Sequence, residues 1–153
     1  MKIYINQLRW IFSSDEVNID IVSREIMNDL KFEFRKNTLI KYRSNPNDYK
    51  KMLVKTAFIF QTWFNTFAKD YESAPEPEET ESINGENLLN LIYHSDVTAY
   101  KVEAETGYAR SNITKLRNKS EVTLDELQMS LGNALLLQRW INENKETFLD
   151  SLK

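Results

Sequence analysis

A short acidic stretch near the middle of the chain most constrains how the chain can fold. Residues 73–81, SAPEPEETE, contain two prolines and four glutamates but no large apolar side chain. Such a segment cannot pack into a core and favours an extended, solvated linker. We therefore predict a helical N-terminal domain over residues 1–72, a linker over 73–81 and a second domain over 82–153. The alternative is one domain with a long surface loop.

The composition favours a globular, mainly α fold on both sides of this linker. Hydrophobic residues make up 41% of the 153 residues, with only three glycines and three prolines. There is no cysteine, which removes disulfides and thiolate metal sites and suits a reducing cytoplasm. We find no signal peptide and no apolar run of the roughly 18 residues that a membrane span needs. We therefore expect a soluble, cytoplasmic protein without membrane contact.

Two long helices are expected before the linker. Apolar residues recur every three to five positions over residues 15–34, which predicts an amphipathic helix. A turn at residues 45–48 would start a second helix over residues 49–67. This second helix is rich in aromatic residues, so we expect it either to be buried on two sides or to present an apolar face to a partner. We find no internal repeat.

A compact bundle of four to five helices is expected after the linker. Its predicted helices are residues 86–93, 97–106, 110–117 and 124–144, joined by short links. Gly107 lies where a helix end favours a positive φ. Ser95 or Asp96 lies where the second helix needs an N-terminal cap.

Residues 97–120 carry the strongest functional signal. As two helices joined at Gly107, they turn Val102, Ile113 and Leu116 inward and leave a polar face on the second helix. From Gly107 to Lys119 there are four basic residues and no acidic one, although residues 82–153 together carry a net charge of −2. This clustering is typical of a face that contacts phosphates and base edges.

This segment resembles the lambda-repressor-like (XRE-type) helix-turn-helix that is common in small phage and Gram-positive regulators. The resemblance rests on Thr-Ala-Tyr-Lys at 98–101, Glu-Thr-Gly at 105–107 and Ile-Thr-Lys-Leu-Arg-Asn at 113–118, and extends over roughly residues 84–144. It departs at Glu103, where that family usually places a small residue at the contact between the two helices. We expect either a slight rotation of the first helix or a Glu103 stem that lies across the contact.

The resemblance implies that the second helix enters the major groove of double-stranded DNA. Ser111, Asn112 and Lys115 would lie nearest the base edges, and Arg110 would reach a base or a phosphate. For each residue the alternative is a solvated helix face. The full set of predicted DNA-contacting residues is Thr98, Tyr100, Lys101, Tyr108, Arg110, Ser111, Asn112, Thr114, Lys115, Arg117, Asn118 and Lys119.

A homodimer is expected because one recognition helix reads only a few base pairs. The helix predicted over residues 124–144 has more apolar surface than a minimal bundle needs. It would form either the dimer seam or ordinary core. Its apolar residues are Leu124, Leu127, Leu131, Leu135 and Trp140.

A second basic region spans residues 31–55, with eight basic residues against two acidic ones and with aromatic residues between them. It would be a second nucleic-acid surface, a docking surface for an acidic partner, or a solvated face. The residues that we select for such a surface are Lys36, Lys41, Arg43, Lys50, Lys51 and Trp63.

The sequence carries no signature of an enzyme. It has one histidine, no cysteine, no glycine-rich phosphate loop and no cluster at metal-ligand spacing, so we expect no catalytic residue, metal or cofactor. We interpret His94 as a structural or surface residue.

Two function classes follow from these observations. The first is a sequence-specific DNA-binding transcriptional regulator, a repressor or autorepressor of phage or mobile-element type. In it the N-terminal domain would dimerise, sense a signal or widen the DNA contact. The second is a bifunctional inhibitor, similar in organisation to fusions of anti-CRISPR domains with helix-turn-helix modules. In it the N-terminal domain blocks a host protein while the helix-turn-helix represses its own promoter.

Overall fold

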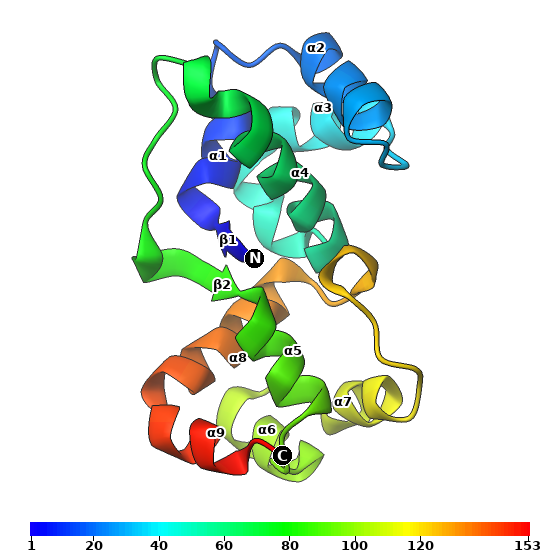
Figure 1. The fold of residues 1–153 in the computed structure, drawn as a ribbon, viewed down its shortest axis with the longest axis vertical. Coiled ribbons are helices and arrows are strands. Elements are labelled where there is room, and N and C mark those ends of the chain that lie inside the picture. Colours follow the sequence, from blue (N-terminus) through cyan, green and yellow to red (C-terminus); the bar gives the residue numbers. More distant parts are fainter.

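The computed structural model describes all residues 1–153, and it is mainly helical, as predicted (Figure 1). Two lobes lie one above the other, with a two-stranded sheet between them. None of the helices combines the length and hydropathy that a membrane crossing requires.

The upper lobe in Figure 1 contains the first half of the chain. Its strand and α-helices are β1 (Lys2–Tyr4), α1 (Ile5–Ser13), α2 (Ile19–Arg24), α3 (Lys36–Ser44) and α4 (Val54–Phe67). A π-helix continues α2, and short 3-10 helices follow α3, follow α4 and precede the second strand: η1 (Glu25–Asp29), η2 (Pro46–Lys51), η3 (Ala68–Asp70) and η4 (Glu79–Glu81).

The lower lobe contains most of the second half of the chain. Its strand and helices are β2 (Ser82–Asn84), α5 (Gly85–Tyr93), α6 (Ala99–Thr106), α7 (Arg110–Arg117), α8 (Leu131–Glu143) and α9 (Lys145–Ser151). The 3-10 helix η5 (Leu124–Glu126) lies between α7 and α8 in the sequence and packs against α4 of the upper lobe.

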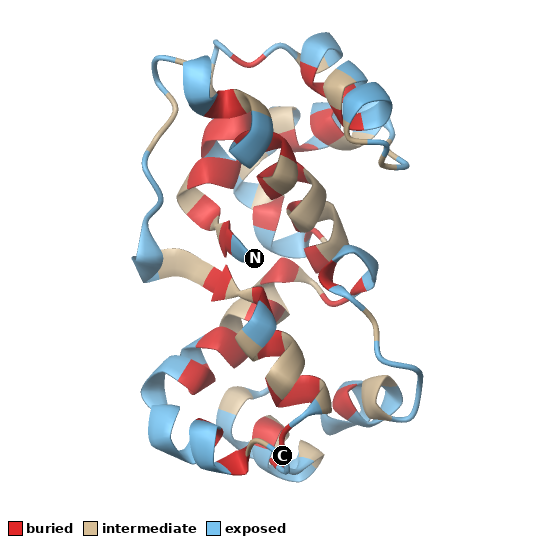
Figure 2. Cartoon of the chain, in the orientation of Figure 1, coloured by how far each residue is buried: buried red, intermediate tan, exposed pale blue.

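Two backbone pairings join the halves. The strands β1 and β2 run antiparallel with Ile3 opposite Ile83, and both of these side chains are fully buried. Leu53 forms an isolated antiparallel bridge with Ser130. Because the strands and the bridge bring distant parts of the sequence together, the core forms one continuous cluster that includes residues of both lobes (Figure 2).

The bridge explains why two predicted helices are shorter than expected. Residues 52 and 53 are extended because Leu131 N–H donates to the Met52 carbonyl at 2.6 Å and Val54 N–H donates to the Met129 carbonyl at 2.8 Å. The helices predicted over 49–67 and 124–144 are therefore wrong at their starts. The helix predicted over 15–34 is also too long, since it comprises only α2 and η1.

The acidic segment 73–81 is mostly exposed and lacks regular structure up to η4, and it is hydrogen-bonded to α1 and to Glu16 just beyond it. Ser73 N–H donates to a Glu16 carboxylate oxygen at 2.8 Å, and the Asn6 side chain donates to the Glu76 carbonyl at 2.7 Å. The Gln7 side chain donates to the Pro75 carbonyl at 3.2 Å. The segment thus lies fixed against the upper lobe, while the division into two domains stays a prediction.

The two lobes repeat the same order of elements, a repeat that sequence inspection missed. A strand, a helix and a helix pair are followed by a longer helix in both: β1, α1, α2, α3 and α4 above, and β2, α5, α6, α7 and α8 below.

Candidate nucleic-acid interface

The helices α6 and α7 are joined by a turn of three residues. The turn starts at Gly107, which ends α6. Its φ of 83° confirms the predicted positive φ. The cap of α6 is Thr98, whose hydroxyl accepts from Lys101 N–H at 3.1 Å, so the predicted caps Ser95 and Asp96 are wrong. Ser95 instead belongs to the end of α5, since its hydroxyl donates to the Leu91 carbonyl.

The outer face of α7 is polar and exposed. Ile113 is buried beneath it and Leu116 is half-buried, as predicted. The predicted DNA-contacting residues that lie exposed on α7 or just beyond its end are Arg110, Ser111, Asn112, Thr114, Lys115, Asn118 and Lys119. None of these residues is acidic, so the face offers hydrogen-bond donors and positive charge.

Glu103 caps α7, which explains the departure from the helix-turn-helix pattern. Its carboxylate accepts from Arg110 N–H at 2.8 Å and lies 3.7 Å from Nε of the same arginine. Ala109, at the N-cap position, has no side chain that could satisfy this N–H. A carboxylate there also interacts favourably with the helix dipole. The Arg110 guanidinium lies 5.8 Å from the ring centre of Tyr100, a residue that is 67% exposed.

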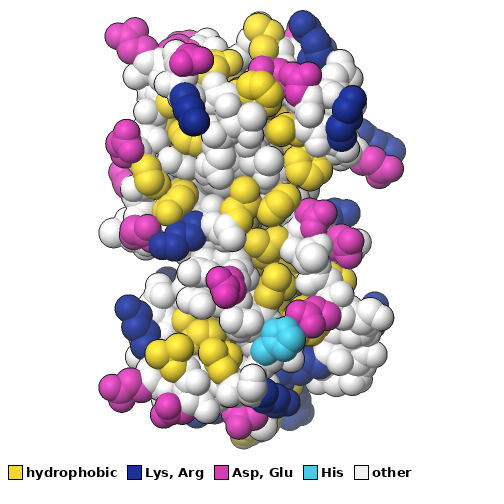
Figure 3. Space-filling model, viewed as in Figure 1, with side chains coloured by type: hydrophobic (Ala, Val, Ile, Leu, Met, Phe, Trp, Pro, Cys, Tyr) yellow, Lys and Arg dark blue, Asp and Glu magenta, His cyan; other side chains and the backbone are white.

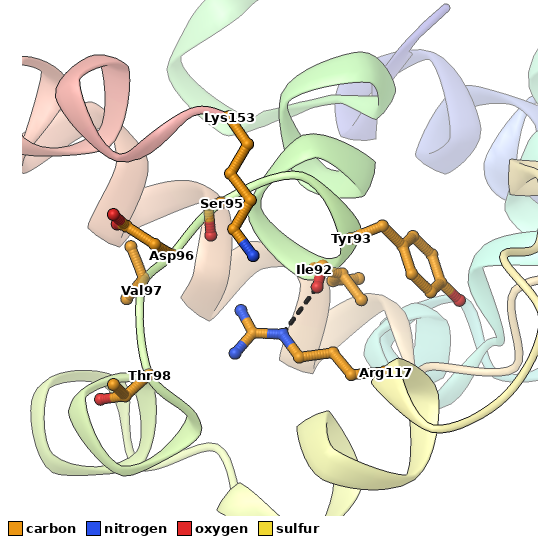
Figure 4. A pocket seen from close by; sticks show the side chains of 8 residues that line it. All are labelled: Ile92, Tyr93, Ser95, Asp96, Val97, Thr98, Arg117 and Lys153. Atoms are coloured by element: carbon orange, nitrogen blue, oxygen red, sulfur yellow. Dashed lines mark hydrogen bonds between the residues drawn. The ribbon is translucent and has the colours of Figure 1, made fainter.

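Arg117 fastens α7 to the C-terminal end of α5 (Figure 4). Its Nε donates to the Ile92 carbonyl at 2.7 Å and its Nη2 donates to the Leu91 carbonyl at 3.0 Å. Burial lowers the pKa of this guanidinium from its usual value. The Lys153 side chain and Asp96 line the same open hollow. Arg117 therefore positions α7 from the inside, a role that the sequence analysis did not foresee.

Three further residues predicted to contact DNA are either buried or already have a partner within the chain. Tyr108 is buried, and burial raises the pKa of its hydroxyl. The hydroxyl of Thr98 is occupied as the α6 cap. Lys101 is exposed and lies 3.9 Å from a carboxylate oxygen of Glu105.

The residues selected from the second basic region do not share one surface role. Trp63 is fully buried, so it does not belong to a docking surface. Arg43 donates to the carbonyls of Ile11 and Ser14 at 3.1 and 2.6 Å. The four selected lysines are exposed, and two of them, Lys36 and Lys51, form ion pairs with acidic neighbours: Lys36, Lys41, Lys50 and Lys51. Basic and acidic side chains are interspersed on the face that Figure 3 shows.

The predicted dimer seam is wrong because its side chains are used inside the chain. Leu124, Leu127, Leu131 and Trp140 are buried and Leu135 is half-buried. The alternative, ordinary core packing, is confirmed. A homodimer through another surface stays a prediction.

His94 is half-exposed, and its Nε2 lies 2.7 Å from a carboxylate oxygen of Glu121. No group of three or more His, Asp or Glu side chains is placed to hold a metal ion.

Comparison with protein-family models, curated proteins and solved structures found no match for this chain. The resemblance to the lambda-repressor-like helix-turn-helix therefore stays a prediction from residues 84–144.

Proposed function

We propose that the chain is a sequence-specific, double-stranded-DNA-binding regulator of transcription, with α7 as the helix that enters the major groove. The observation that carries this proposal is the outer face of α7, which is exposed, rich in donors and free of acidic residues. The same helix is held from inside by buried Ile113 and by the Arg117 hydrogen bonds. Rigid placement of an exposed polar helix supports base reading because it limits the conformational entropy lost on binding.

The side chains of this face match the chemistry of base edges. The Asn112 amide is suited to adenine N6 and N7, and Lys115 is suited to guanine O6 and N7. Each such contact discriminates against a wrong base by about 1–3 kcal/mol. Tyr100 and Lys101, on α6, would contact the phosphate backbone. Arg110 would exchange its Glu103 partner for a phosphate or a base.

A bundle bound over a promoter would exclude polymerase, which makes repression the expected mode of regulation. The phage or mobile-element setting rests on the resemblance alone. The second function class requires a partner surface on the N-terminal half. The aromatic side chains Phe60, Trp63 and Phe64 of α4 are buried and Phe58 and Phe67 are half-buried, so α4 itself presents little apolar surface to a partner.

The test uses the full chain and sequences selected from randomised duplex DNA. We expect Asn112→Ala with Lys115→Ala to lower affinity for the selected duplex at least tenfold. The salt slope, which is the slope of the logarithm of the binding constant against the logarithm of the salt concentration, should fall in magnitude by about 1. The matched control is Asn28→Ala with Lys145→Ala, an exposed asparagine and an exposed lysine outside the α6–α7 pair. The proposal fails if both variants bind the selected duplex as the wild type does.

A further inference from the structure

The contacts between the two lobes are reciprocal. In the strand pair, Lys2 faces Asn84 and Tyr4 faces Ser82, with Ile3 and Ile83 at the centre. At the bridge, the hydrogen bonds from Leu131 to Met52 and from Val54 to Met129 run in opposite directions around the Leu53–Ser130 pair. Reciprocal contacts of this kind are what a two-fold axis generates between two copies of one unit. Every antiparallel pairing has this local symmetry, but here the paired residues are also separated by the distances at which the lobes repeat, 80 positions for Ile3 and Ile83 and 77 for Leu53 and Ser130. Together with the matches below, the pairings therefore indicate an approximate two-fold axis between the lobes.

The first helices of the lobes, α1 and α5, have the same bounds at a separation of 80 positions, and the N-caps of the second helices match at the same separation. Leu8 and Leu88 are both fully buried, one in α1 and the other in α5. Asn18 and Thr98 occupy the N-caps of α2 and α6, and each side chain accepts from the N–H three residues later, at 3.0 and 3.1 Å. The equivalent helices α2 and α6 thus begin with the same local hydrogen bond.

The longer helices match at a separation of 77 positions. Residues 61–65 read QTWFN and residues 138–142 read QRWIN. Both glutamines are buried, and each amide donates to the asparagine four residues later, at 3.0 and 2.9 Å. Each glutamine oxygen also accepts from a strand N–H of its own lobe, Tyr4 at 2.9 Å and Asn84 at 2.8 Å.

Two further interactions recur. The indole of Trp63 donates to Glu25 at 3.2 Å, and that of Trp140 donates to Glu105 at 3.1 Å. Arg43, at the end of α3, donates to carbonyls at the end of α1, as Arg117 of α7 does at the end of α5. Because Arg43 and Arg117 hold their helices against equivalent partners, α3 takes the place of α7 in the upper lobe.

The exposed face of α3 matches that of α7 in pattern and charge. Reading the helices in parallel, Leu39 corresponds to Ile113 and both are fully buried. Lys41 corresponds to Lys115, and both are exposed. Each helix also begins with a basic residue that pairs with an acid on the preceding helix: Lys36 with Asp20 and Arg110 with Glu103. No acidic residue occurs between residues 34 and 47.

We infer that α3 is a second recognition helix and that one chain binds both half-sites of a single DNA duplex. This inference rests on the proposed function of α7. The occupant of the α3 face is a second segment of the same duplex, because α3 carries exposed lysines and no acidic residue of its own, which complements phosphate, and because the two-fold axis pairs this face with α7. As Arg110 does with Glu103, Lys36 would exchange its Asp20 partner for a phosphate. A protein with a single helix-turn-helix needs a second chain to bind the second half-site, whereas this chain supplies both recognition helices.

The two half-sites differ in sequence and lie in inverted orientation. The two-fold relation sets the orientation. The difference follows from the facing side chains, since Thr38 of α3 stands where α7 has Asn112, and Ile40 stands where α7 has Thr114. An exposed isoleucine is suited to contact with a thymine methyl group. The target is therefore a bipartite, asymmetric site bound by one chain.

The test selects sequences from randomised duplex DNA with the full-length wild type and with two variants. The α3 variant is Asn37→Ala with Lys41→Ala, and the α7 variant is Asn112→Ala with Lys115→Ala. All four side chains are exposed, and circular dichroism melts verify that both variants stay folded. We expect the DNA selected by the wild type to contain two separate conserved stretches, or blocks. The DNA selected by the α3 variant should lack one block, and the DNA selected by the α7 variant should lack the other. Sedimentation should give one chain per duplex, and each variant should lose about 1 from the salt slope.

Other outcomes separate this inference from the proposed function. A single block that the α3 variant leaves unchanged, or two chains bound per duplex, would overturn the second recognition helix and leave the role of α7 intact. Absence of any enriched sequence would overturn both.

Discussion

The two lobes hold equivalent helices but connect them differently. In the lower lobe, Gly107 ends α6 and a three-residue turn leads to α7. In the upper lobe, the π-helix η1 extends α2, and Lys31 takes the positive φ of 62° before the chain reaches α3. The cores, the N-caps and the arginine hydrogen bonds are alike nonetheless. The comparison shows that interior contacts, rather than the turn, determine where the outer helix lies.

The largest effect is expected from removing the buried indole of each lobe, which tests whether the two lobes share one core. Trp63→Ala and Trp140→Ala should each lower the free energy of unfolding by about 3–5 kcal/mol, because each leaves a large cavity in the core. Since the two lobes share one core, each variant should still unfold in a single transition. Urea denaturation followed by fluorescence and by circular dichroism checks this. Two separated transitions would mean that the lobes fold independently.

The arginine hydrogen bonds give the next largest effect. Arg43→Met and Arg117→Met should each cost about 1–3 kcal/mol, because helix-end carbonyls lose charged donors. The exposed Lys41→Ala and Lys115→Ala serve as controls and should change stability by no more than about 0.5 kcal/mol. Thermal melts measure all four. An Arg117→Met variant as stable as wild type would return that side chain to the DNA-contacting set.

Substitutions at Gly107 and Lys31, in the connections before α7 and α3, should change stability in opposite directions. Gly107→Ala should destabilise by about 1 kcal/mol, because a side chain at this φ is strained although nothing crowds its Cβ. Lys31→Gly should stabilise by up to about 1 kcal/mol, because it relieves the same strain. Denaturation midpoints compare the two variants directly. Equal signs would show that the positive φ does not strain the backbone at one of the two positions.

The smallest effect concerns how segment 73–81 is held. Hydrogen bonds from the Ser73 side chain and backbone lower the pKa of Glu16 below its usual value of 4.5. A lowered folded-state pKa gives stability that is complete above the usual value and is lost as the pH falls through the lowered one. Glu16→Gln should therefore lower the melting temperature at about pH 6 and have less effect at about pH 3. An equal effect at both pH values would contradict this attachment.

The sequence predicted the lower lobe better than the upper one for physical reasons. Gly107 and the apolar residues around it signal a helix pair locally, so the bounds predicted for residues 110–117 coincide with α7. The helix α3 was missed because only Leu39 and Tyr42 of it are buried, which leaves little apolar periodicity. The breaks before α4 and α8 come from pairing between distant segments, which no local pattern reveals.

Two features of the site could have been found from the sequence, and one could not. The repeated Gln-x-Trp-x-Asn of residues 61–65 and 138–142 is a direct sign of the internal repeat. An arginine at the end of both α3 and α7 is a second sign. The capping of α7 by Glu103 depends on how α6 and α7 pack, so the sequence showed only an unusual residue at that contact.

The most direct test of the central claim records amide chemical shifts of the full chain while the selected duplex is added. Binding through both lobes predicts perturbed amides on the outer faces of α3 and α7, with saturation at one chain per duplex. Perturbation of α7 alone would contradict the second recognition helix, and perturbation of neither helix would contradict the DNA-binding account as a whole.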